Sequence, residues 1–573
     1  MQKASLNSQL ERRCGFFREG FFARVSLMLL ASLFLVALAG RAQDTATIVG
    51  TVTDTSGAVV PNCTVTVSNP DRGFVRVVQS NSAGEYAAAR IPIGNYVITA
   101  EMTGFQKLVH SGISLNAGQE QRVDLTLTVG QVAQQISVSG NVTKVETESA
   151  TLSSVITSKQ IQNLTLNGLN FGALTFLVPG AAQDNGYSEA QQLGHAGAEV
   201  GVSFNGNREE YSQLELDGGN NAQESSTSMG GAVTPAIDMI AEFRISTSNY
   251  GADVGQHAGA LVEIATKGGT KQFHGDAYEF VRNDAMDAND WFANQQIAPP
   301  GGNAPKTPLK WNIFGYTIGG PFYIPHHYNT DKSKTFFFWS QEWARYRQAS
   351  VVSGNVPTPQ MRQGDFSQCD PSSGSYVPLL VEQGCVLPSV NGAPVDSVSV
   401  HPNGAAWLNG FVPLPNNGID GYIAAHSVPT NFSQKSIRVD QNINDKMSLF
   451  VRFTNDEWAK TVVPALWSGS SYDSTQSIYE VPARQTVLHI NNNLKPTLLN
   501  EFIMSYTDTP HFIAVQAGPG SPAHSVDKPL DLGRLHFLPG QRGQPTASVN
   551  FSRGRYAFQL HREQRKLSRR LRR

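Results

Sequence analysis

The chain has little charge, few cysteines and few long apolar runs. Charged residues make up 16% of the 573 residues, and the formal net charge is −2. Such a balanced charge gives no extended positive field, so we expect no binding of nucleic acid. After Ala39 no apolar run approaches the ~20 residues of a transmembrane helix. Any later crossing of a membrane must therefore use strands.

The chain also lacks the sequence patterns of a metal site. None of its 13 histidines begins an HxxE or HExxH pattern, and the four cysteines show no zinc-site spacing. We therefore predict no catalytic residue, no metal site and no cofactor. The protein is not expected to be an enzyme.

The N-terminus has the pattern of an export signal. Arginines between positions 12 and 24 precede the apolar stretch Val25–Ala39. A basic segment, an apolar segment and small residues predict a signal peptide over residues 1–42, cleaved between Ala42 and Gln43. The alternative is an uncleaved membrane anchor.

Residues 43–129 alternate apolar and polar side chains in short runs separated by turn signals. This pattern predicts about seven short strands and a β-sandwich. Cys63 lies in one predicted strand and is expected to be a buried thiol. The phrases GTVTDTSGAVVPNCTVTV and SAGEYAAARIPIGNYVITAEMTGF resemble a carboxypeptidase regulatory-like domain. That resemblance implies a transthyretin-like sandwich without catalysis.

The run Ile240–Phe292 carries several ordered signatures. It contains TSNY at 247–250, TKGGT at 266–270, FHG at 273–275 and RND at 282–284. In this order the signatures resemble the seam between plug and barrel in TonB-dependent outer-membrane receptors of the Oar-like subgroup. The resemblance implies a mainly β protein: an α/β plug over residues 130–268, then the N-terminal part of a transmembrane antiparallel β-barrel over 269–551.

The same resemblance implies a short segment that pairs with TonB. Its expected position is residues 134–140, although the usual acidic residue is missing. The segment consists of Gln134, Gln135, Ile136, Ser137, Val138, Ser139 and Gly140. An exposed extended segment can join a partner's sheet by strand addition. The implied partner is the TonB-ExbB-ExbD complex, and the alternative is an ordinary linker strand.

Seven stretches after Gly269 have the ~9–11 residues that a tilted membrane strand needs. They are 273–282, 312–322, 334–345, 436–443, 447–455, 484–494 and 497–506. Ile437 and Val439 alternate with polar neighbours, as expected of a wall between outer-membrane lipid and a plugged lumen. A soluble sandwich has the same alternation. The aromatic stretch KTFFFWSQEWARYR favours the barrel.

Two polar stretches, 283–310 and 349–431, are expected to be long extracellular loops. The second contains Cys369 and Cys385, for which we predict a disulfide because the chain is exported. In the plug segment, Asn-Gly and Asp-Gly pairs predict tight turns with positive φ. Asp217 of one such pair is read as a turn residue held by side-chain-to-backbone bonds. The alternative is a cation site formed by Asp217 with Asn220 and Asn221.

The last 22 residues, 552–573, form a basic run unlike the rest of the chain. Together with a strand number far below ~22, this run suggests a truncated or out-of-frame end. The leading functional hypothesis is energy-coupled uptake of an unidentified ligand across the outer membrane. The alternative is an exported β-rich adhesion or carbohydrate-binding surface protein.

Overall fold

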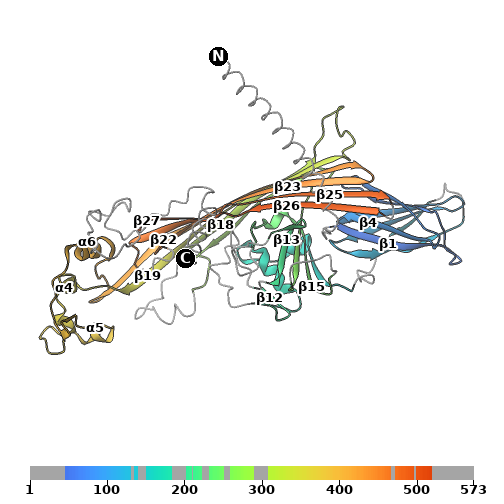
Figure 1. Cartoon of the computed structure of the whole chain (residues 1–573). Helices are drawn as coiled ribbons and strands as arrows, with labels where there is room; N and C mark the ends of the chain where they lie inside the picture. The colour runs from blue at the N-terminus through green and yellow to red at the C-terminus, as the bar shows by residue number, and fades with distance from the viewer. Residues whose placement is uncertain are drawn as a thin grey trace, which may run out of the picture.

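The protein consists of a sandwich, a small central domain and a large curved sheet (Figure 1). The central domain lies under the sheet, and the sandwich lies at one end of it. The computed structural model describes residues 45–130, 135–139, 150–183, 202–208, 211–221, 231–250, 258–289, 308–465, 472–495 and 498–518. The predicted signal peptide with its Ala42–Gln43 junction and the basic tail lie outside these residues.

The sandwich has two sheets that face each other across an apolar core. The first sheet contains β1 (Thr45–Asp54), β4 (Glu85–Pro92), β7 (Glu120–Arg122) and β8 (Leu125–Leu127). The second contains β2 (Thr64–Asn69), β3 (Phe74–Gln79), β5 (Gly94–Glu101), β6 (Lys107–Leu115) and β9 (Gln135–Ser139). Alternate side chains of β1 are buried, which is the predicted pattern. Burial raises the pKa of the Cys63 thiol to about 11, so this cysteine is the expected buried thiol.

The segment predicted to meet TonB is the fifth strand of the second sheet. Its strand, β9, pairs in parallel with β6, with Lys107 opposite Gln135 and Ser111 opposite Ser139. Gln134 and Gly140 lie outside the described residues. The segment is therefore extended, as predicted, but it lies against the sandwich.

The central domain is built on a mixed five-stranded sheet with short helices beside it. The strands are β10 (Leu152–Thr157), β15 (Ile240–Ser248), β16 (Leu261–Thr266), β13 (Gln213–Leu216) and β14 (Gly219–Asn220). The other elements are α2 (Ser158–Asn163), η1 (Asn167–Leu169), η2 (Phe171–Leu177), η4 (Ile237–Met239) and the pair β11 (Ala181–Gln183) and β12 (Val202–Phe204). All six residues of β16 are buried, so this strand lies at the centre of the domain.

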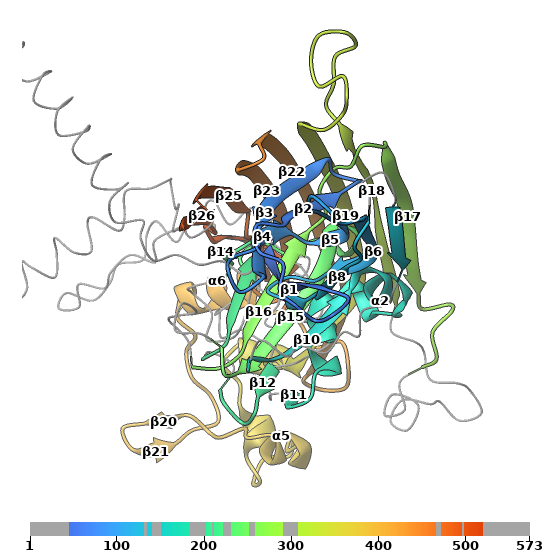
Figure 2. The ribbon, with the colours of Figure 1, turned by 90° about the vertical axis from the view of Figure 1, so that its right-hand side faces the viewer.

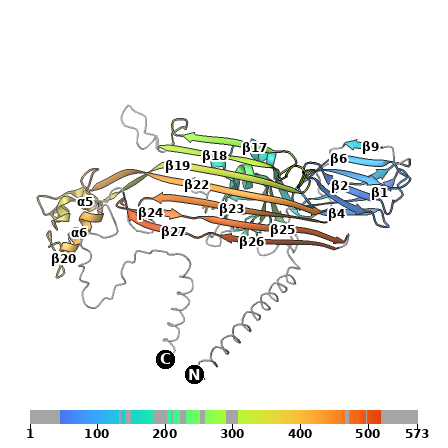
Figure 3. The same ribbon diagram turned by 90° about the horizontal axis from the view of Figure 1, so that it is seen from above.

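The large sheet is antiparallel and curves over the central domain (Figure 2). Its strands lie side by side in Figure 3. They are β17 (His274–Asn283), β18 (Leu309–Pro321), β19 (Thr335–Asn355), β22 (Gly421–Asn444), β23 (Met447–Val462), β24 (Thr475–Glu480), β25 (Ala483–Lys495), β26 (Leu498–Asp508) and β27 (Phe512–Ala517). β23 pairs with β25 along most of its length and with β24 near its end.

The two faces of the large sheet differ in polarity, as predicted. The outer face exposes Ile437, Val439, Val451 and Phe453, whereas Arg438 and Arg452 between them are buried against the central domain. Of the described residues, no helix is long and apolar enough to cross a membrane.

The predicted strand lengths need correction at one end of the sheet. β19 and β22 pair over 21 residues, from Thr335–Gln441 to Asn355–Gly421, so the ladder continues into the stretch expected to be a loop. The predicted length of these strands came from the thickness of a membrane. The pairing between β19 and β22 continues beyond that length. Strands β24 and β27 were not predicted because each has only six residues.

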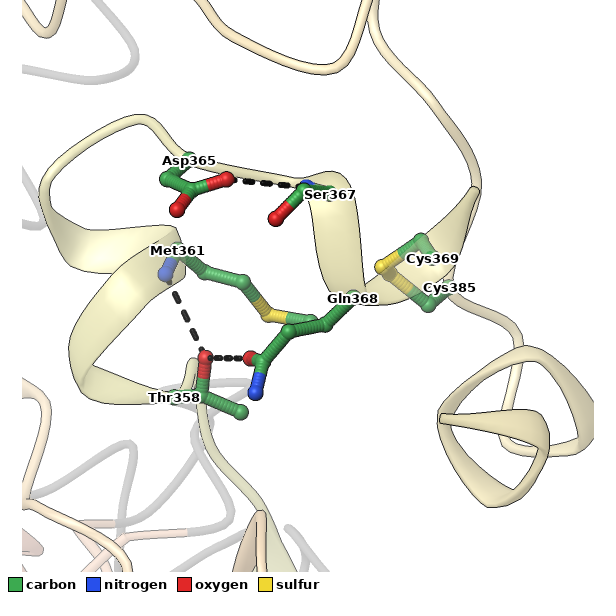
Figure 4. Close-up of a disulfide and its surroundings, with 7 residues drawn as sticks. All are labelled: Thr358, Met361, Asp365, Ser367, Gln368, Cys369 and Cys385. Atoms are coloured by element: carbon green, nitrogen blue, oxygen red, sulfur yellow. Dashed lines mark hydrogen bonds between the residues drawn. A yellow bond between two sulfur atoms is a disulfide. The ribbon is translucent and has the colours of Figure 1, made fainter. Parts of the chain in front are cut away.

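The rest of the expected loop forms a small lobe at the end of the sheet opposite the sandwich (Figure 1). Its elements are α4 (Pro359–Arg362), η5 (Ser367–Cys369), α5 (Pro378–Glu382), β20 (Ser389–Val390), β21 (Ala393–Pro394) and α6 (Pro402–Phe411). Figure 4 shows Cys369 and Cys385 joined by a disulfide with a Cα–Cα distance of 5.9 Å. Nearby, the Thr358 hydroxyl caps α4 by accepting from the Met361 backbone N–H.

Candidate functional site

One tight turn of the central domain lies against the inner face of the large sheet. Asp217 and Gly218 join β13 to β14 with φ values of 53° and 73°. Two consecutive positive φ values are typical of the turn that Asp-Gly pairs favour, so the predicted turn is confirmed. A Cβ on Gly219 would lie 2.8 Å from a methyl of Val487. The hairpin is therefore pressed closely against β25.

The Asp217 side chain binds two arginines of the large sheet. Its Oδ2 accepts from Arg452 Nε at 2.6 Å, and its Oδ1 accepts from Arg438 Nη1 at 3.2 Å. The backbone N–H and hydroxyl of Thr266 donate to the same carboxylate, each at 2.8 Å. Arg438 also pairs with Asp440 at 2.9 Å. We call Asp217, Thr266, Arg438, Asp440 and Arg452 the ion cluster.

The ion cluster is balanced in charge, and all its members except Asp440 are buried. Asp217 is 1% exposed and Arg452 is fully buried. Burial alone would raise the pKa of Asp217, but Arg438, Arg452 and the Thr266 hydrogen bonds outweigh it and lower that pKa. Two arginines face two carboxylates, which meets the requirement that buried charges be paired.

The sequence predicted only part of this geometry. The predicted side-chain-to-backbone bond of Asp217 exists in its contact with Thr266. The cation-ligand alternative is wrong, because two guanidinium groups occupy the carboxylate. The arginines were missed because they lie 221 and 235 residues further along the chain. No local pattern links positions so far apart.

A second contact lies beside the ion cluster. The backbone N–H of Thr234 donates to Asp456 Oδ2 at 2.9 Å, and that of Ala236 donates to Gln434 Oε1 at 2.9 Å. Gln434 also donates to Asp456 at 2.8 Å. These wall side chains satisfy backbone groups of the central domain that burial would otherwise leave unpaired.

A third contact uses the predicted Asn-Gly turn. A Cβ on Gly168, which has φ 64°, would lie 2.0 Å from the ring of Trp311 on β18. Only glycine fits this approach. Leu169, the next residue, packs against the apolar cluster that contains Trp311. The contact at this position is therefore apolar.

The sandwich contacts both the large sheet and the central domain. Arg90 forms an ion pair with Glu501 of β26, which also binds His489 at 2.8 Å. Glu242 of the central domain accepts from the Ala117 backbone N–H at 2.8 Å. Contacts thus connect all three parts of the molecule.

The candidate residues from the sequence are not brought together. Gln135–Ser139 lie on the sandwich, whereas Cys369 and Cys385 lie in the lobe at the opposite end of the sheet (Figure 1). Among the described residues there is no group of three or more His, Cys, Asp or Glu side chains that could hold a metal ion.

Comparison with known proteins supports the outer-membrane assignment. Residues 265–567 match the outer membrane beta-barrel domain family, and residues 47–128 match the carboxypeptidase regulatory-like domain. The chain is 23% identical over 340 residues to the TonB-dependent transporter Oar of Myxococcus xanthus. This similarity covers 57% of the chain and 29% of that transporter.

Two solved structures of outer-membrane proteins show some similarity to this chain. The outer membrane transporter YddB from Escherichia coli is 9% identical, with a TM-score of 0.34 over 60% of this chain and 37% of that one. The siderophore receptor PirA from Acinetobacter baumannii is 11% identical, with a TM-score of 0.31. The similarity covers 64% of this chain and 44% of that receptor. The chain spans less than half the length of these relatives.

The match to the barrel family covers more than half of the chain. The outer face of the large sheet has the apolar side chains that lipid requires. The chain therefore belongs to the outer membrane beta-barrel domain family, carries an N-terminal carboxypeptidase regulatory-like domain and is similar in sequence to a TonB-dependent transporter.

Proposed function

We propose that this chain acts in energy-coupled uptake of a ligand across the outer membrane, with the central domain as the plug. The observation that carries the proposal is the ion cluster. It fixes the Asp217 hairpin to two adjacent wall strands, β22 and β23, through buried charges. A plug held in this way keeps the path closed until work is done on it.

The work would enter through residues 134–140. Among the described residues, β9 pairs with β6 alone, so its second edge is available to a further strand. A TonB strand would add to that edge through backbone hydrogen bonds. Pulling on β9 would then act on the plug, which follows it in the chain.

The uptake proposal needs no catalytic group, because the work is conformational. The ligand would bind at the extracellular lobe and the plug surface below it. Its chemical class stays open.

The test is site-specific crosslinking between residues 134–140 and the periplasmic domain of TonB. Changing Ile136 and Val138 to proline removes two backbone N–H groups, and we expect crosslinking to fall to background. The matched control changes the same residues to threonine, which keeps both N–H groups and favours strands. This control should crosslink like the parent chain.

Equal crosslinking of the proline and parent chains would exclude residues 134–140 as the TonB contact. If the parent chain reaches the outer membrane and no part of it crosslinks to TonB, the adhesion or carbohydrate-binding role becomes the better explanation.

A further inference from the structure

One hairpin of the sandwich ends where the sandwich, the central domain and the large sheet meet. β2 and β3 pair as far as Asn69 and Phe74, and we call residues 69–74 the tip hairpin. Asn69 is 2% exposed, and its side-chain oxygen accepts from the backbone N–H groups of Asp71 and Arg72 at 3.0 and 3.2 Å. These two bonds fix the shape of the turn from within.

The tip hairpin contacts the large sheet at two points. Asn442, near the end of β22, donates through Nδ2 to the Arg72 carbonyl at 3.2 Å and to the Ser333 carbonyl at 2.9 Å. Ser333 lies just before β19. A Cβ on Gly73, which has φ 63°, would lie 2.7 Å from Ser333 Cα. Only glycine allows so close an approach.

The tip hairpin also contacts the segment through which the chain leaves the central domain. Residues 267–273, which we call the connector, run from the end of β16 to the start of β17. The backbone N–H of Lys271 donates to the Asp71 carbonyl at 2.8 Å. A Cβ on Gly269 would lie 2.4 Å from the Phe337 carbonyl oxygen of β19. The connector therefore packs against both the tip hairpin and the large sheet.

Arg72 places the tip hairpin beside the ion cluster. It lines a cavity of about 60 Å³ together with Thr266, Arg438 and Asp440. Thr266 is the last residue of β16, so this cavity lies where the connector begins. Any movement of the central domain out of the sheet would draw Thr266 and the connector past the tip hairpin.

A second contact keeps the sandwich docked. Arg90 forms an ion pair with Glu501 of β26, whose side chain is 1% exposed. Separating a buried ion pair leaves a charge without compensation, so this contact resists removal of the sandwich. The tip hairpin is thus held at the junction by its own contacts and by the docking of the whole sandwich.

We propose that the tip hairpin is an autoinhibitory latch on the plug. While the sandwich is docked, the connector is held and the central domain stays against the large sheet. The latch must leave before the plug can leave. The tip hairpin and β9 belong to the same sheet of the sandwich, so withdrawal of β9 reaches the latch through that sheet. This inference rests on the proposed function, because it assigns a regulator to the plug.

The test is hydrogen–deuterium exchange, read by mass spectrometry, on the full chain extracted from outer membranes in mild detergent. TonB and ligand are left out, so the latch is measured by itself. Gly73→Asn keeps the positive φ, which asparagine tolerates, but adds a Cβ that collides with Ser333. We expect peptides that cover the connector and β16 to exchange roughly tenfold faster. Peptides that cover β1 and β5 should keep their protection, which shows that the sandwich stays folded.

The matched control is Gly57→Asn. Gly57 also has a positive φ, of 87°, in another turn of the sandwich, and no atom lies within 4 Å of its Cβ position. This variant should exchange like the parent chain. A second variant, Asn442→Ala, removes the amide that binds the Arg72 carbonyl and leaves the sandwich sequence unchanged. It should raise exchange in the connector as well, and it decides the question if Gly73→Asn unfolds the sandwich.

Parent-like exchange of the connector in Asn442→Ala, or in a Gly73→Asn variant with a protected sandwich, would overturn the latch. Faster exchange in both variants, together with no crosslinking of residues 134–140 to TonB, would leave the latch in place and reject the uptake proposal. The two failures are therefore distinguishable.

Discussion

Asp217 is the residue on which the junction between plug and wall depends most. Its carboxylate meets Arg438 and Arg452 in a buried site, and its positive φ is compatible with few side chains. Asparagine tolerates the same backbone but carries no charge. The change Asp217→Asn therefore isolates the electrostatic contribution.

We expect Asp217→Asn to lower the free energy of unfolding by about 3–5 kcal/mol, because it leaves buried guanidinium groups uncompensated. The measurement is urea unfolding in detergent micelles. The control is Asp124→Asn, which removes an exposed pair with Arg122 and should change stability by no more than about 1 kcal/mol. Equal effects of the two changes would contradict the assigned role of the ion cluster.

The pH dependence gives a further check on the same variant. The pKa of Asp217 is lowered in the folded protein. The ionised carboxylate therefore contributes to the free energy of unfolding at pH values above its ordinary pKa of 3.8. This contribution is lost as the pH falls through the lower, folded value. The difference between the parent chain and Asp217→Asn should therefore be full at pH 7 and should shrink only in strong acid.

Among the elements, the disulfide loop of the lobe is the most self-contained. Cys369 and Cys385 lie 16 positions apart, and their bond closes a loop around α5. The helices of the lobe have few buried apolar side chains. A cross-link that closes such a loop is worth about 3 kcal/mol in the chain-entropy description.

We expect Cys369→Ser together with Cys385→Ser to make the lobe more sensitive to protease and to leave the rest of the sheet protected. The measurement is limited proteolysis on whole cells, followed by mapping of the fragments. The control variant changes Ser373 and Ser375 to alanine, because both residues lie inside the same loop. Unchanged cleavage of the double cysteine variant would show that the bond does not hold the lobe together.

The sequence predicts elements well where one local pattern decides them. Alternation located β17, β18, β25 and β26 to within a few residues, and it located the start of β23, whose end lies seven residues beyond the predicted position 455. It underestimated β19 and β22, because their ends are stabilised by pairing with each other and not by lipid. The Asp217 turn follows from its Asp-Gly pair, whereas its arginine partners depend on tertiary packing. Long-range contacts of this kind leave no local signal.

At the scale of the whole molecule, β9 connects the sandwich to the plug and also pairs with the sandwich. Val109 of β6 stands opposite Ser137 of β9. A disulfide between these positions would lock β9 in place and leave its second edge open.

We expect Val109→Cys with Ser137→Cys, once oxidised, to retain TonB crosslinking and to reduce ligand uptake to background. TonB would still find the open edge, but β9 could no longer leave β6. Adding a reductant should restore uptake, and the parent chain under the same reductant controls for the lobe disulfide. Loss of crosslinking in the locked chain would show that TonB needs the edge that β6 occupies.

The parallel pairing of β9 with β6 also has a mechanical consequence. A load applied along β9 stretches all of the ladder's hydrogen bonds at once, in shear, whereas a load across the strand opens them one after another. The direction of the applied load therefore sets the threshold at which β9 detaches. The sandwich would therefore hold β9 against a load along the strand and would release it under a load perpendicular to the strand.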